Sequence, residues 1–70
     1  MKKPHIVELT EAYRRQVVVW AEDENEAFEI ATDLYETGEI DMTRNTFDRL
    51  DIDVIGIAAE SNVGMYDQFS

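Results

Sequence analysis

The 70-residue chain carries sixteen acidic and six basic side chains, for a formal net charge of −10. This charge argues against direct binding to DNA, RNA or an anionic membrane, because like charges would repel, and it favours a partner with a basic surface. The length allows one small domain, near the size at which a hydrophobic core becomes marginal. A second copy or a bound partner would therefore add stability.

Cysteine is absent, so the chain has no disulfide framework and no cysteine-based metal site, and a reducing compartment is favoured. No apolar run approaches the roughly 18 to 20 residues that a membrane span needs. The first residues, Met1 to Pro4, lead into alternating residues rather than into the apolar core of a signal peptide. We expect a soluble, cytoplasmic protein.

Alternation of apolar and polar residues predicts three β-strands. The first covers His5 to Glu11, the second Arg14 to Ala21 and the third Leu50 to Ala58. The first two strands are expected to form an antiparallel hairpin that turns near residues 11–13. In the second strand, Val18 and Trp20 lie on the face opposite Val17, Val19 and Ala21.

A helix is predicted between the second and third strands, with both of its ends marked. Asp23 is a suitable N-cap with Glu26 three residues later, and Gly38 is suited to the left-handed conformation that ends a helix. One helix face is apolar and is expected to pack on the hairpin. Its members are Ala27, Ile30, Ala31 and Leu34, widened by Phe28 and Tyr35.

The remaining segments lack a clear period. Ile40, Met42 and Phe47 are expected to contribute apolar contacts beneath an irregular loop, and the tail at 59–70 either docks or frays. The fold predicted is α+β: a ββαβ domain at 1–58, with a three-stranded antiparallel sheet and one helix packed on one face.

Four segments carry a family resemblance: Val7-x-Leu9-x-Glu11, Arg15-x-Val17-x-Val19-x-Ala21-Glu22, Asp23-x-x-Glu26-Ala27 and Tyr35-x-x-Gly38-Glu39-Ile40. Together they resemble the DpnD/PcfM-like proteins, which are short proteins of bacterial phages, conjugative plasmids and restriction cassettes. The resemblance covers about residues 5 to 57. It implies a ββαβ fold and a mobile-element setting in a bacterial host, and it brings no catalytic residues. The chain departs from the family where Val18 and Trp20 replace polar residues on the outer side of the second strand.

The arrangement of acidic residues is the first functional candidate. Glu22, Glu26, Glu29, Asp33 and Glu36 recur every three or four residues and are expected to form one stripe along the helix. Their mean axial spacing of about 5 Å is similar to that of successive phosphates on a nucleic acid strand. One interpretation is that the stripe mimics a nucleic acid and occupies the basic groove of a nucleic-acid-binding protein. The other is that it only keeps a small domain soluble.

The second candidate is an apolar cluster on the outer face of the sheet. Ile6, Val18 and Trp20 share that face, which ordinarily is polar when a helix covers the other side. The cluster either forms a homodimer interface or is covered by the C-terminal tail through Met65, Tyr66 and Phe69.

Other constellations are weaker. The Asp51 and Asp53 pair echoes a calcium-binding loop, but strand alternation explains it better, and a single histidine leaves no His pair for a metal. We therefore expect no metal or other cofactor and no enzymatic activity. The function predicted is inhibition of a host nucleic-acid-binding defence protein, of the anti-CRISPR or anti-restriction type, and the alternative is a homo-oligomeric interaction module.

Overall fold

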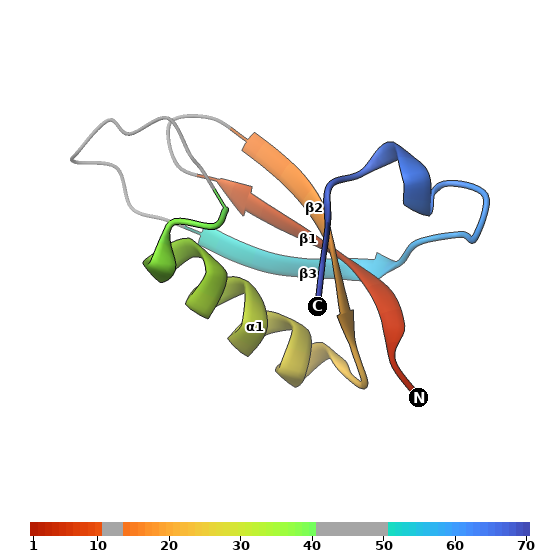
Figure 1. Ribbon diagram of the computed structural model, residues 1–70, viewed down its shortest axis with the longest axis horizontal. Coiled ribbons are helices and arrows are strands. Elements are labelled where there is room, and N and C mark those ends of the chain that lie inside the picture. The colour runs from red at the N-terminus through yellow and green to blue at the C-terminus, as the bar shows by residue number, and fades with distance from the viewer. Residues whose placement is uncertain (11–13, 41–50) are drawn as a thin grey trace.

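The computed structural model describes residues 1–10, 14–40 and 51–70 (Figure 1). Its elements, in chain order, are β1 (Lys3–Thr10), β2 (Arg14–Ala21), α1 (Glu24–Thr37), β3 (Asp51–Ile57), the short 3₁₀ helix η1 (Val63–Met65) and β4 (Gln68–Phe69). The strands form one mixed sheet in the order β3-β1-β2-β4. The predicted α+β class is confirmed.

Strand β1 lies in the interior of the sheet and pairs antiparallel with both β2 and β3. The predicted hairpin is confirmed by its register, which runs from Lys3 opposite Ala21 to Thr10 opposite Arg14. The predicted turn at 11–13 lies outside the described residues. The pairing of β1 with β3 contains a bulge, because Ile55 is an extra residue between the two partners of Val7 and Ile6.

The prediction of three antiparallel strands is wrong in one detail, because the C-terminal tail adds a fourth strand. Strand β4 pairs parallel with β2, where Val18 lies opposite Gln68 and Val19 opposite Phe69. The backbone N–H of Val18 also donates to the carbonyl oxygen of Asp67 at 2.9 Å. After β3 the chain returns to the opposite edge of the sheet and pairs with β2 there (Figure 1).

A hydrophobic core lies between α1 and one face of the sheet. Its buried members are Val7, Leu9, Val17, Val19, Ala21, Ala27, Ala31 and Ile40. The two helical alanines have short side chains, which allow α1 to lie close to the strands. Ile30, Leu34 and Tyr35 pack at the margin of this core as predicted, whereas Phe28 is 46% exposed.

A second, smaller cluster occupies the other face of the sheet. Ile6, Val18 and Trp20 pack there against Ala58, Val63 and Tyr66 of the C-terminal segment. The two clusters use alternate residues of β1 and β2, as expected for the opposite faces of a sheet. The described residues therefore lie in three layers: α1, the sheet and the segment at 58–67. Within the described residues, no helix has the length and apolar character needed to span a bilayer.

Candidate functional site: the acidic face of the helix

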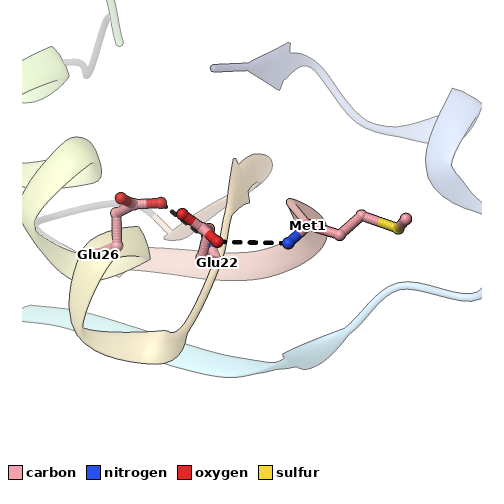
Figure 2. Close-up of polar contacts among 3 residues, drawn as sticks. All are labelled: Met1, Glu22 and Glu26. Carbon is pink, nitrogen blue, oxygen red and sulfur yellow. Dashed lines mark hydrogen bonds and ion pairs between the residues drawn. The ribbon is translucent and has the colours of Figure 1, made fainter.

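The start of α1 is fixed by two reciprocal hydrogen bonds. The Asp23 carboxylate accepts from the backbone N–H of Glu26 at 2.8 Å, which confirms Asp23 as the N-cap. The Glu26 carboxylate in turn accepts from the backbone N–H of Glu22 at 2.8 Å (Figure 2). In a standard capping box, the second side chain accepts from the backbone N–H of the N-cap residue itself, which here is Asp23. In this protein Glu26 instead accepts from the residue before the N-cap.

The prediction that Glu22 belongs to the helical stripe is wrong, because α1 begins at Glu24. Glu22 lies in the bend between β2 and the helix, where its Oε1 is 3.3 Å from the N-terminal ammonium of Met1 (Figure 2). Both groups are largely exposed, at 95% for Met1 and 63% for Glu22, so the pair contributes little stability. Glu22 and Glu26 thus already have partners within the fold.

The other end of α1 closes as the sequence indicates. Gly38 has a φ of 85°, and its N–H points to the carbonyl oxygens of Leu34 and Tyr35. The N–H of Glu39 donates to the same Leu34 carbonyl at 2.9 Å, which completes the C-terminal cap. The last helical turn contains no basic residue, so nothing in it offsets the negative end of the helix dipole.

Three of the predicted stripe residues form a continuous acidic face on α1, which we define as Glu29, Asp33 and Glu36. All three are exposed, and no ion pair or hydrogen bond joins them to another side chain in the described part of the chain. Axial steps along the face are about 6 Å and then about 4.5 Å. Because like charges at these spacings repel, the acidic face destabilises its own helix by about 0.2–0.5 kcal/mol per pair.

A shallow, open depression of about 280 Å³ adjoins the acidic face. Phe28, Glu29, Thr32 and Asp33 line it, and the Thr32 hydroxyl donates to the carbonyl oxygen of Phe28 at 2.8 Å. Phe28 was expected to widen the buried apolar face of the helix, and the helical periodicity did not predict this depression. The sequence contains one indication of the depression. Phe28 comes directly before Glu29 and four residues before Thr32, so Phe28 and Thr32 lie on the same side of the helix.

The predicted oligomer interface lies beneath the chain's own tail. Val18 is fully buried and Ile6 and Trp20 are partly buried, which leaves no open apolar patch of the kind expected. The indole N–H of Trp20 donates to the Gln68 side chain at 3.1 Å. Of the three tail residues proposed to cover the patch, Tyr66 does so, whereas Met65 is 80% exposed and Phe69 packs with the helix-side core.

The remaining candidates have structural positions. Asp51 and Asp53 lie on β3, as strand alternation indicated. Arg15 forms an ion pair with Asp67 at 2.6 Å, and Arg14 lies 3.7 Å from Glu8. The described residues contain no group of three acidic or histidine side chains placed to hold a metal ion. Met42, Phe47, Arg44 and Arg49 lie outside the described residues.

Comparisons with known proteins gave no match among protein-family models, curated proteins or solved structures. The resemblance to the DpnD/PcfM-like proteins therefore stays a prediction.

Proposed function

We propose that the protein binds a basic surface on a nucleic-acid-binding protein and competes there with the nucleic acid. The observation that carries this proposal is the acidic face: Glu29, Asp33 and Glu36 are exposed and have no cationic partner in the described part of the chain. The row of like charges destabilises the helix, whereas acids scattered over the surface would solubilise the domain without this repulsion. The arrangement in a row therefore favours a binding role over a role in solubility alone.

The geometry supports a contact made by the helix as a rod. The acidic face extends over about 10 Å along α1, and Asp23 and Glu26 hold the start of the helix in a fixed place. A partner that binds nucleic acid offers lysine and arginine side chains along a groove, which is complementary to a row of carboxylates. The acidic face would then displace the phosphates from that groove.

The biological setting follows from the family resemblance as part of the same proposal. A protein of a phage or mobile element that blocks a nucleic-acid-binding surface would protect that element from a bacterial defence enzyme, such as a CRISPR effector or a restriction system. This role requires no catalysis and places the protein in the bacterial cytoplasm. The homo-oligomeric module is less favoured, because the tail covers Ile6, Val18 and Trp20.

The test compares capture of host proteins by the native chain and by a variant with Glu29→Lys and Asp33→Lys. We expect the native chain to retain nucleic-acid-binding proteins that added duplex DNA releases, and purified partners to lose DNA binding when the chain is added. Reversal of the two charges should weaken this binding at least about tenfold, because attraction becomes repulsion. Binding should also weaken as salt rises.

The matched control reverses two exposed acids outside α1, with Glu39→Lys and Glu60→Lys. This variant has the same net charge as the test variant but keeps the acidic face, and we expect it to bind almost as the native chain does. Equal capture by all three proteins would contradict the proposal, as would equal loss in both variants.

A further inference from the structure

Phe28 is the one aromatic side chain of the described residues that is exposed. It is 46% exposed and belongs to neither hydrophobic cluster, although it directly follows the buried Ala27 on α1. Each of the other described aromatic side chains packs against one of the clusters: Trp20, Tyr35, Tyr66 and Phe69. The exposed phenyl ring adds nothing to the core, and its position leaves it available for contact with another molecule.

Phe28 lines the depression of about 280 Å³ together with Glu29, Thr32 and Asp33. Phe28 and Thr32 are four residues apart, as are Glu29 and Asp33, so the members of each pair are neighbours on the helix surface. The apolar ring therefore lies beside two carboxylates. The depression is smaller than the roughly 300–1,000 Å³ of a small-molecule site, so it suits a single side chain of another protein.

The side-chain polar atoms that line the depression are all acceptors. The carboxylate oxygens of Glu29 and Asp33 accept hydrogen bonds and donate none. The Thr32 hydroxyl already uses its hydrogen, because it donates to the carbonyl oxygen of Phe28 at 2.8 Å. The backbone N–H groups of residues 28–33 lie inside α1, where they bond to carbonyl oxygens one turn earlier. A ligand for this depression must therefore bring hydrogen-bond donors, a positive charge and an apolar face for the ring.

Arginine meets these requirements better than lysine does. Its guanidinium group is planar, carries only N–H donors and is more weakly hydrated than an ammonium group. It can stack on an aromatic ring while its N–H groups donate to carboxylates in the plane of the guanidinium group. Lysine would pair with the carboxylates as a compact, strongly hydrated point charge, and it would gain less from the ring.

We propose that this depression receives one arginine side chain of the partner protein, with the guanidinium group stacked on the Phe28 ring and hydrogen-bonded to Glu29 and Asp33. Charge complementarity decides the occupant, because a chain with a net charge of −10 attracts a basic protein and repels a second copy of itself. The arginine would belong to the basic surface that the acidic face binds, so this assignment rests on the proposed function. It adds a preference for arginine over lysine, which attraction between charges alone does not provide.

The experiment is an NMR titration of the full chain with short blocked peptides of equal length, which alternate glycine with arginine or with lysine. We expect the arginine peptide to bind at least about threefold more tightly than the lysine peptide, because arginine gains more from the ring. The amide signals of Phe28 and Thr32 should shift most, and nuclear Overhauser contacts should join the Phe28 ring to the arginine side chain. A third peptide with citrulline, which has the shape of arginine without its charge, should not bind measurably.

Phe28→Leu tests the ring apart from the charges. Because Phe28 lies outside both clusters, we expect this variant to keep the native fold, while its preference for the arginine peptide falls below about 1.5-fold. Met65→Leu is the matched control at an exposed apolar residue outside α1, and it should keep the native preference. Glu29→Gln should weaken the binding of both charged peptides. Glu60→Gln makes the same charge change at an exposed residue outside α1 and should weaken that binding less.

Equal binding of the arginine and lysine peptides, with Phe28→Leu indistinguishable from the native chain, would overturn the arginine site and leave the proposed function as a contact between charges alone. Citrulline binding as tight as that of arginine would assign the depression to an uncharged ligand and would overturn the site as well. A Phe28 signal that shifts with chain concentration alone would assign it to a second copy, with the same consequence. A native chain that prefers the arginine peptide but captures no nucleic-acid-binding protein would support the arginine site and overturn the proposed function.

Discussion

Asp23 determines where α1 begins and thereby where the acidic face is presented. It has an extended backbone with φ −150° and ψ 178°, and its carboxylate bonds the N–H of Glu26 at 2.8 Å. We predict that Asp23→Ala lowers the free energy of unfolding by about 1 kcal/mol, because the first helical turn loses its side-chain acceptor. Urea denaturation monitored by circular dichroism measures this change.

Asp23→Asn separates capping from charge. Asparagine also accepts the hydrogen bond at an N-cap, so this variant should retain most of the native stability although it removes one negative charge. If Asn and Ala destabilise equally, the charge near the positive end of the helix dipole, rather than the hydrogen bond, is what matters at this position.

Single residues also show which structural features the sequence predicts and which it does not. The cap at Asp23 was predictable because its determinants lie within three residues of each other. The position of Glu22 outside α1 was predictable as well, because the second strand was expected to end at Ala21 and Asp23 was expected to be the N-cap; the predicted stripe wrongly extended the helical spacing across that cap. Phe28 was assigned to the buried face by its apolar character, but the distance from α1 to the sheet is set by Ala27 and Ala31, and Phe28 remains exposed.

At the scale of elements, repulsion within the acidic face makes α1 less stable than it would be without those charges. We predict that Asp33→Lys raises the free energy of unfolding by about 1 kcal/mol. The change converts two repulsive pairs, with Glu29 and Glu36, into attractive ones at about 0.2–0.5 kcal/mol for each pair removed or made. It also places a cation toward the negative end of the helix dipole. Thermal and urea unfolding at low salt measure the gain.

Glu24→Lys is the matched control, with the same charge change in the first turn of the same helix. There a cation meets the positive end of the dipole, so this variant should be destabilised. Equal stabilisation by both substitutions would mean that net charge alone, and not position along α1, governs the effect. If the Asp33→Lys variant is more stable than the native chain but no longer binds the partner protein, the acidic face favours binding at the expense of stability.

The elements differ in how far they were predictable. Strands β1, β2 and β3 follow from alternation, and α1 from its caps and apolar face, because each has at least seven residues of pattern. Strand β4 has only two residues and no pattern of its own. It exists because Val63 and Tyr66 dock on the sheet and bring Gln68 and Phe69 beside β2, which is a non-local effect.

At the scale of the whole molecule, the described residues of this 70-residue chain form two hydrophobic clusters on opposite faces of one sheet. A domain of this size has little apolar surface to spare, so both clusters are expected to matter for stability. The C-terminal segment is part of the packed structure, because without it Ile6, Val18 and Trp20 would form an apolar patch in contact with water. With this segment docked, the outer face of the sheet is covered. Without it, we expect the chain to associate through that face.

We predict that deletion of residues 59–70 lowers the free energy of unfolding by about 3 kcal/mol or more, since the burial of Val63 and Tyr66 is lost. Trp20 is the sole tryptophan, so its fluorescence emission should shift to longer wavelength as water reaches the indole. The truncated chain should also self-associate in light scattering. Asp67→Asn is the control: it removes only the exposed ion pair with Arg15, and it should cost less than about 1 kcal/mol and leave the emission unchanged. A truncated chain with native stability and native Trp20 emission would show that the segment does not pack on the sheet in solution.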